Sequence, residues 1–308
     1  MSFDFALESK LLYESPKLHK IFSDNVMCCQ NILNKYKSVF PTYTDHTVLH
    51  SLEVIAFCNE LVGNNIDKIN CDEIFVLLMA AYLHDSGMGI SESDYAEFSE
   101  QIPMVLEYRR ENPSAPIDEV VRTFHHEFSG KFIKKYQMIF DFPSEAHLWA
   151  TIQTSRGHRK TDLYDENEYP EEIVLENGNI IHLPYLAALI RITDELDIAA
   201  DRNIQFLYNI NSPGIDQNVS SKIAFNKHLA IKEVVCCEDS IMAMVDFSDA
   251  ELNPHLFSDF EKLNATLCQC VDVTDKRTPF EITQKQFGAY DCYTKEAVFV
   301  GGKIIKAN

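Results

Sequence analysis

The sequence predicts a mainly α-helical protein with a smaller α+β portion at its C-terminus. Up to about residue 205, apolar residues recur at helical spacing in one segment after another. After about Arg202 the pattern changes, and two short segments alternate apolar and polar residues as β-strands do. We therefore expect a helical domain over residues 1–205 and an α+β domain of unknown role over residues 206–308.

The helical segments follow one another from the N-terminus. Thr44 and Asp45 form a start signal for the second segment, and Pro184 stands in the first turn of the last. The third segment, "CDEIFVLLMAAYLHD", is apolar almost throughout after its acidic first turn, which predicts a helix buried on most sides. The predicted helices cover residues 11–40 with a break at Pro16, 44–62, 71–85, 116–136, 143–158 and 184–201.

The C-terminal part has a mixed pattern. Residues 226–237 and 240–247 alternate like two strands, and Glu238–Asp239 between them would form a turn. Residues 254–275 have a helical pattern, and residues 295–308 could form a terminal strand. This part contains no motif from which its chemistry can be inferred. An exposed strand edge would allow the chain to form a homodimer.

The composition limits the classes of function. A formal net charge of −20 disfavours binding to duplex DNA or RNA, which depends on basic contacts. No apolar run approaches the roughly 18–20 residues of a membrane span, and "MSFDFALESK" lacks the pattern of a signal peptide. The nine cysteines include no C-x-x-C pair, which favours free thiols in a reducing cytosol. We therefore expect a cytoplasmic protein in which any phosphate chemistry needs a local positive centre, such as a bound cation.

Six histidine and aspartate residues stand within or at the ends of predicted helices. His84 and Asp85 follow the apolar run "IFVLLMAAYL", where burying an unpaired charge is costly, so each needs a hydrogen-bond partner or an ion. Neutral imidazoles bind divalent transition metals, and carboxylates add negative charge and can bridge two ions. The candidate metal ligands are His50, His84, Asp85, His125, His158 and Asp194.

Four other histidines have a simpler interpretation. A lone histidine on an apolar helix face is more often a hydrogen-bonded core residue than a ligand, because its ring can be satisfied by one or two neighbours. We apply this interpretation to His147, His182, His228 and His255.

Several segments together resemble the HD-domain metal-dependent phosphohydrolases, which are named for a His–Asp doublet. "YTDHTVLHSLEV" is similar to their first-ligand helix, and "AAYLHDSGMG" to the apolar helix that delivers the doublet. "LAALIRITDELDIAADR" is similar to their helix with the distal aspartate. "RTFHHEFS" and "IQTSRGHRK" resemble the added histidines of the subgroup that binds two metals. The resemblance covers about half of the chain, residues 40–205.

The resemblance implies an HD-type helical bundle with two divalent metal ions, which would be Mn, Fe or Mg. The implied activity is hydrolysis of a small, nucleotide-like phosphoester by water held between the metals. Asp85 would be catalytic by holding the ions, and Asp197 or a nearby histidine would handle the proton. The implied ligands are His50, His84, Asp85 and Asp194 for the first ion, and Asp85, His125 and His158 for the second.

Two histidines beside these ligands are candidates for substrate contacts. A slip of one residue would exchange His126 with His125. We prefer His125 as the ligand because it follows Arg122 by three residues and precedes Ser129 by four, which is similar to the family's Arg-x-x-His-x-x-x-Ser order. His46 lies one helical turn before the first ligand, where it could orient that ligand, contact substrate or be a surface residue.

Charged neighbours add further alternatives. Arg191 shares a helix side with Asp194, so it could bind a phosphate oxygen or form a salt bridge with Asp194 or Asp197. Asp197 could support a ligand or act as a general acid or base. Lys131 and Lys160 could contact phosphate, although solvated surface lysines are the simpler interpretation.

The same constellation leaves other functions open. The sequence after "HHE" lacks the Asp-Gly-x-Gly-Tyr-Pro run of HD enzymes that cleave cyclic di-GMP, so that substrate loses support. A di-iron HD-fold oxygenase would use the same ligands and would be revealed by iron content and oxygen uptake. A non-catalytic HD-fold ligand sensor is the third alternative. All six ligand positions are intact, which favours a metal centre over a sensor that could lose them.

Overall fold

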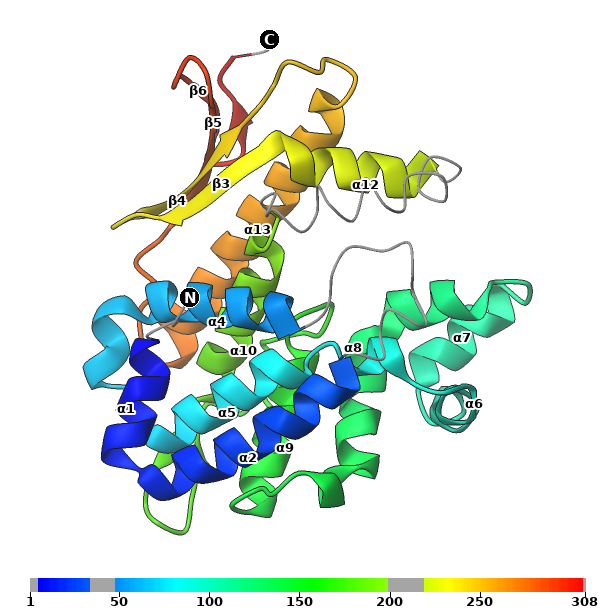
Figure 1. The fold of residues 1–308 in the computed structure, drawn as a ribbon, viewed down its shortest axis with the longest axis vertical. Helices are drawn as coiled ribbons and strands as arrows, with labels where there is room; N and C mark the ends of the chain where they lie inside the picture. Colours follow the sequence, from blue (N-terminus) through cyan, green and yellow to red (C-terminus); the bar gives the residue numbers. More distant parts are fainter. Residues whose placement is uncertain (1–4, 34–47, 199–218, 307–308) are drawn as a thin grey trace.

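The computed structural model describes residues 5–33, 48–198 and 219–306. Within these ranges the chain is mainly helical with a small C-terminal sheet, which confirms the predicted fold class (Figure 1). The helices before the sheet are α1 (Ala6–Glu14), α2 (Pro16–Leu33), α4 (Val48–Val62), α5 (Cys71–Leu83), α6 (Glu92–Ser99), α7 (Pro103–Glu111), α8 (Ile117–Lys135), α9 (Glu145–Arg156) and α10 (Leu183–Leu196).

The predicted helices agree closely with the observed ones. The break at Pro16 is confirmed, because Pro16 begins α2 and its fixed φ suits a first helical turn. The predicted start signal at Thr44 and Asp45 lies outside the described residues. Helices α6 and α7 were not predicted, since both are short. The short 3₁₀ segments are η1 (Gly63–Asp67), η2 (Ser86–Gly89) and η3 (Gln137–Ile139).

Helix α5 is the centre of the bundle. It begins with a capping box in which the Asn70 side chain accepts from the Glu73 backbone N–H and the Glu73 carboxylate accepts from the Asn70 N–H. Every residue from Asp72 to Leu83 is buried, as the apolar run predicts. Helices α1, α2, α4, α9 and α10 pack around it. The His–Asp doublet at its end is therefore delivered into the interior.

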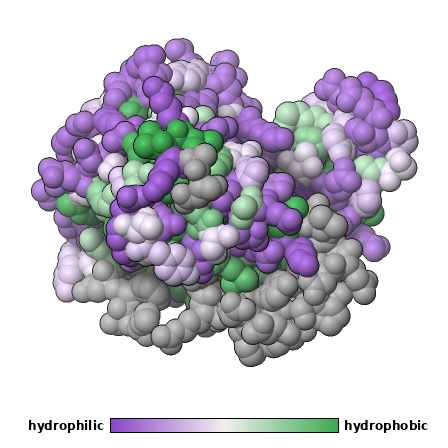
Figure 2. Space-filling view, turned by 90° about the horizontal axis from the view of Figure 1, so that it is seen from above, coloured by the Kyte–Doolittle hydropathy of each residue, from purple (hydrophilic) through white to green (hydrophobic). Residues whose placement is uncertain are grey.

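Helices α6 and α7 form a protrusion beside α8 (Figures 1 and 2). They have their own small hydrophobic cluster, in which residues such as Phe98 and Val105 pack against Val121 and Phe128 of α8. Helix α8 thus lies between two cores, with one side toward the protrusion and the other toward α9.

The C-terminal part is a five-stranded sheet with two helices. The strands lie in the order β3-β4-β5-β6-β7, and all neighbours are antiparallel except β4 and β5, which are parallel and joined through α13. The elements are α12 (Val219–Ala230), β3 (Ile231–Cys236), β4 (Ser240–Val245), α13 (Asn253–Arg277), β5 (Gln286–Asp291), β6 (Ala297–Val300) and β7 (Lys303–Ile304).

Three predictions for this part need correction. Residues 226–230 are the end of α12 and not part of a strand. Strand β5 was not predicted, because the short segment that forms it lacks clear alternation. The terminal segment forms two strands, since Gly301 and Gly302 turn the chain at φ values of 55° and 83° that suit glycine. The predicted turn at Glu238–Asp239 is confirmed.

The sheet is attached to the bundle by α13, which packs along α10 (Figure 1). One hydrophobic cluster includes Leu186 and Leu189 of α10 together with Phe260 and Leu267 of α13. The predicted domain division at residue 205 lies outside the described residues. The described core is continuous from the bundle to the sheet.

Hydrophilic residues predominate on the face of the molecule shown in Figure 2. All nine cysteines have free thiols. In the described part of the chain, no single helix has the length and apolar composition of a membrane span. Only the bent pair Cys71–Gly89 and Glu92–Ser99 meets that test together, with an angle of 98° between its two parts.

Candidate metal centre

The six predicted ligands come together in the interior, and each stands near the end or the break of a helix. They are His50 in the first turn of α4, His84 and Asp85 after α5, His125 after a kink in α8 at Phe124, His158 after α9 and Asp194 in the last turn of α10. The two acidic residues and four histidines thus come from five helices. A rigid packing of those helices fixes their geometry.

The first group of ligand atoms lies around His50 and His84. The Nε2 atoms of these two rings are 3.0 Å apart. Asp194 Oδ1 lies 3.3 Å from His50 Nε2 and 3.5 Å from His84 Nε2. Asp85 Oδ2 lies 3.7 Å and 3.6 Å from the same two nitrogens. Four side chains therefore converge on one point.

The second group lies on the other side of Asp85. The Nε2 atoms of His125 and His158 are 2.9 Å apart. Asp85 Oδ1 lies 3.4 Å from His125 Nε2 and 3.8 Å from His158 Nε2. Asp85 thus turns one oxygen toward each pair of histidines, which is the arrangement of a carboxylate that bridges two cations.

The outer nitrogens of the rings are all held by the protein. In His84, His125 and His158, Nδ1 donates to the carbonyl oxygen three residues earlier, over 3.0, 2.7 and 2.5 Å. Each of these contacts satisfies the outer nitrogen of its ring with a backbone carbonyl one helical turn earlier. His50 Nδ1 donates instead to Asp197 Oδ2 over 2.7 Å. In each ring the lone pair of Nε2 therefore faces the centre.

The charges of the centre explain what it can hold. Burial lowers the pKa of His125 to about 4 and that of His158 well below its usual value, so both rings are neutral near pH 7. Burial also opposes protonation of His50 and His84, but nearby carboxylates outweigh it and raise the pKa of both rings. Burial opposes ionisation of Asp194, yet hydrogen bonds from His50 and His84 hold its pKa well below the usual value.

These donors fit divalent metal ions. The Nε2 lone pairs of the neutral rings His125 and His158 face each other at 2.9 Å, and they repel unless a cation lies between them. The raised pKa of His50 reflects the same preference for positive charge at the first group. His50, His84 and Asp85 form one set of three mutually close ligand atoms, and Asp85, His125 and His158 form another. Imidazole and carboxylate together suit divalent metal ions.

The small residues after the doublet allow α8 to approach the centre. A Cβ atom on Gly87 would lie 2.3 Å from the His125 carbonyl oxygen and 2.4 Å from the Ser129 nitrogen, so only glycine fits there. The Ser129 hydroxyl accepts from the Gly87 N–H at 2.8 Å and donates to the His84 carbonyl oxygen. Glycine at position 87 of the segment "AAYLHDSGMG" therefore lets α8 come close enough for His125 to reach the same centre.

The HD-CE family model matches residues 40–270 of the chain, which is more than half of its length. The chain belongs to the HD-CE family. No curated protein and no solved structure gives a significant match to it. The family match and the buried clusters together make the chain an HD-type metalloprotein, as the resemblance implied. The match continues beyond residue 205 through β3 and β4 and ends within α13.

Of the two roles considered for Arg191 in this HD-CE protein, the salt bridge with Asp194 or Asp197 is not formed. Its buried guanidinium donates to the Gly157 carbonyl and to both oxygens of Thr161 at 2.7–3.0 Å. Arg191 therefore fixes the segment after α9 that carries the fourth histidine, and its contact with phosphate stays a prediction.

The substrate contact considered for His126 stays a prediction, and its surroundings are those of a core residue. Its ring is buried and lies edge-on to His125 and His158, at centroid distances of 6.1 and 6.3 Å. Neither nitrogen has a hydrogen-bond partner in the part of the chain that the structure describes. The choice of His125 over His126 as the residue at the centre agrees with the geometry. His46 lies outside the described residues.

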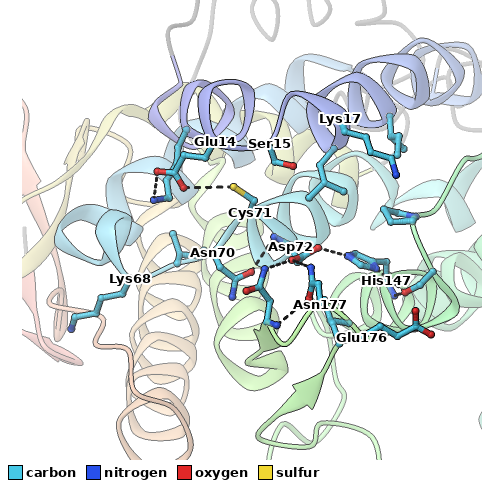
Figure 3. A pocket seen from close by; sticks show the side chains of 18 of the residues that line it. Glu14, Ser15, Lys17, Lys68, Asn70, Cys71, Asp72, His147, Glu176 and Asn177 are labelled. Atoms are coloured by element: carbon cyan, nitrogen blue, oxygen red, sulfur yellow. Dashed lines mark hydrogen bonds and ion pairs between the residues drawn. The ribbon is translucent and has the colours of Figure 1, made fainter.

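A second group of histidines and carboxylates lies at the opposite end of the same helices. Asp72 in the first turn of α5 accepts from His147 Nε2 at 2.8 Å and from the side chains of Asn177 and Asn179 (Figure 3). The Asp72–His147 pair lines an open cavity of about 780 Å³ between the α1–α2 junction and the segment 175–179. Sequence analysis treated His147 as a core residue and did not single out Asp72.

Another residue that sequence analysis missed is Arg159, directly after His158. The turn that carries both was identified only by its histidine. Helical periodicity ends at this turn, so nothing in the pattern showed which of its three basic side chains would be used inside the fold.

Proposed function

We propose that this HD-CE protein is a metal-dependent phosphohydrolase that hydrolyses a small, nucleotide-like phosphoester. The observation that carries this proposal is the position of Asp85, whose two oxygens face two separate pairs of imidazoles. A site with two adjoining cation positions and one shared carboxylate suits the in-line displacement of a phosphoester by water.

The residues that would hold the two ions, Mn, Fe or Mg, are the six ligands described above. When bound, the ions supply Lewis acidity toward water and toward the phosphate oxygens. Asp85 and Asp194 would offset part of the positive charge, and the four imidazoles would complete the coordination without adding charge once His50 and His84 have released their protons to the solvent. Mixed imidazole and carboxylate ligands favour Mn or Fe over Mg.

The chain's own residues position these ligands. Asp197 fixes the ring of His50 through its outer nitrogen, which supports the orienting alternative for this carboxylate. Ser129 and Arg191 hold the turns that bear His84 and His158. Removal of any of these contacts would change metal affinity before it changed the fold.

The substrate proposed is a small phosphorylated molecule, with no duplex nucleic acid and no membrane as partner. The ligands are buried, so a reacting phosphate must enter the interior rather than lie on a broad surface. The net charge of −20 opposes the approach of a polyanion, whereas a single phosphate group carries little charge to repel. A cytoplasmic location remains part of the proposal because reduced thiols suit it.

A combined metal and phosphate-release measurement tests the proposal. The chain should be purified without chelator, analysed for metal, and assayed with Mn²⁺ under argon against nucleotides and simple phosphoesters. We expect close to two ions per chain and phosphate release that His84→Ala abolishes. His255→Ala removes an exposed histidine of α13 and should leave both unchanged.

Two results would contradict the proposal. Phosphate release that is unchanged in His84→Ala would place the chemistry elsewhere. Bound iron with oxygen uptake and no phosphate release would favour the oxygenase alternative instead.

A further inference from the structure

The segment from Arg156 to Thr161 carries the fourth histidine of the centre and three basic side chains. The first of these, Arg156, is used within the fold. Its Nη2 atom lies 2.7 Å from Glu127 and 3.3 Å from Glu168, and its Nε donates to Glu127. Arg156 is therefore a structural cation.

The segment after Arg156 is held in place at both ends. Arg191 donates to the Gly157 carbonyl oxygen on one side of His158 and to the Thr161 oxygens on the other. A Cβ atom on Gly157 would lie 2.7 Å from Ala187 Cβ, so the turn is pressed against α10. The residues between these two anchors are thus presented from a fixed backbone.

Arg159 lies between these anchors, and its side chain differs from those of Arg156 and Arg191, which are both used within the fold. Its side chain is half-buried, and it forms no hydrogen bond or ion pair with any residue in the part of the chain that the structure describes. It directly follows His158, a ligand of the second group, and its positive charge contributes to the lowered pKa of both His125 and His126.

Among the lysines and arginines that the structure describes, only Arg159 and Lys131 are half-buried without a side-chain hydrogen bond or ion pair, and of these two only Arg159 is next to a ligand in the chain. The sequence has 47 acidic residues against 27 lysines and arginines, so carboxylates to pair with are abundant. Partial burial without a partner costs free energy, and such a cost is offset when an anion binds. A guanidinium is well suited to that role, because its planar donors match two oxygens of a phosphate group.

We propose that Arg159 is the residue that binds the phosphate oxygens of the substrate, the role first expected for Arg191. This inference rests on the proposed phosphohydrolase function and adds a substrate-contacting residue to it. The geometry that carries it is the sequence position directly after His158, the fixed backbone between the two contacts of Arg191, and the absence of any internal partner for the guanidinium.

Equilibrium binding of inorganic phosphate tests this role without turnover. The full chain is reconstituted with Mn²⁺, and the dissociation constant for phosphate is measured by titration calorimetry for the parent, Arg159→Ala and Arg159→Lys. We expect Arg159→Ala to weaken phosphate binding roughly 10- to 100-fold, as for loss of a charged hydrogen bond. Arg159→Lys keeps the charge but loses the planar donors, so its dissociation constant for phosphate should lie between those of the parent and Arg159→Ala.

The controls separate a phosphate contact from a general effect. Arg110→Ala removes an exposed arginine of α7 and should leave phosphate affinity unchanged. Metal content and melting temperature should be the same in all variants, because the Arg159 side chain forms no hydrogen bond or ion pair in the described part of the chain.

The failure of this inference is distinguishable from the failure of the function. If the parent binds phosphate and Arg159→Ala binds it equally well, Arg159 is not the contact and the hydrolase proposal stands. If the parent with two Mn²⁺ ions neither binds phosphate nor releases it from any ester, the function fails and the role of Arg159 fails with it.

Discussion

The two ends of helices α5, α9 and α10 use the same types of residue in different ways. At the end where the helices start, histidines pair with carboxylates in the first turns. At the end where they finish, histidines and carboxylates meet again, and the metal centre lies there. Both groups are buried, so residue type and burial do not distinguish them.

The starting ends form a complete set of hydrogen bonds. Asp72 accepts from His147 and two asparagines, and the outer nitrogen of His147 lies 2.8 Å from the Ser144 hydroxyl. Glu73, fully buried, accepts from both the backbone N–H and Nδ1 of His182. These contacts connect the start of α5 to the starts of α9 and α10, and they occupy both ring nitrogens of His147 and the Nδ1 of His182.

The finishing ends lack such a complete set. There, each outer nitrogen is satisfied, but the inner Nε2 atoms of His125 and His158 face only each other and the Asp85 carboxylate. The difference shows that the metal centre is marked by Nε2 atoms whose lone pairs have no hydrogen-bond donor to face, and not by the number of histidines. The hydrogen bonds at the starting ends also connect the three helices α5, α9 and α10. They thereby help to align the helices that deliver His84, His158 and Asp194 to the centre.

The largest effect is expected from the same amide substitution at the two ends of α5. Asp85→Asn removes the carboxylate shared by both groups, so we expect loss of both metal ions and roughly a 10²-fold or greater loss of activity. Asp72→Asn changes the same functional group in the first turn and should keep two ions. Metal analysis by mass spectrometry of both purified variants checks this. Full metal content in Asp85→Asn would show that the carboxylate does not bridge.

The sequence carried enough information for the centre but not for the starting ends. His84 and Asp85 were predictable because they end an apolar helical run, where an ionisable side chain is out of place, and the other ligands were predictable through the resemblance to the HD-domain family. The interpretation as hydrogen-bonded core residues is correct for His147 and for the half-buried His182, and it is wrong for His255, which is exposed. The partners of the first two, Asp72 and Glu73, escaped notice because acidic residues are ordinary in a first helical turn. Only the folded arrangement shows that both are buried.

The contact of Arg191 with the turn after α9 was missed for a similar reason. Helical spacing placed this arginine on the same side as Asp194, and that spacing is correct. The spacing could not show that the turn after α9 lies nearer to the guanidinium than the centre does, because this contact joins residues 30 or more apart in the chain. Strand β5 and the terminal hairpin were missed for the related reason that pairing partners, and not local pattern, define short strands.

An intermediate effect is expected from the carboxylate that supports a ligand without joining the centre. Asp197→Asn weakens the contact that orients His50, so Mn²⁺ affinity should fall by about 10- to 100-fold. Glu195→Gln is a matched control two residues away, because Glu195 pairs with Lys262 at 3.0 Å. The Mn²⁺ affinity of both variants is measured by titrating each protein with Mn²⁺ in a calorimeter. Unchanged metal affinity with lost turnover in Asp197→Asn would support the alternative role in proton transfer.

The smallest effect is expected at the starting ends, and it concerns stability. Burial raises the pKa of Asp72, but hydrogen bonds from His147, Asn179 and Asn177 outweigh it and lower the pKa from 3.8 to about 2. His147→Ala removes one of these donors and should lower the free energy of unfolding by about 1.5–3 kcal/mol near neutral pH, with two ions still bound.

The pH dependence of this stability has a definite sign. Because the pKa of Asp72 is lower in the folded state, its carboxylate stabilises the fold fully above pH 3.8, and this contribution is lost as the pH falls toward 2. The difference in unfolding free energy between the parent and Asp72→Asn should therefore shrink as the pH falls from 5 toward 3. Urea unfolding of the metal-free proteins measures it, since the acid would otherwise also release metal. A difference in unfolding free energy that stays constant over this range would mean that the charge of Asp72 does not stabilise the fold. The contrast between the two ends of the helices would then depend on the metal centre only.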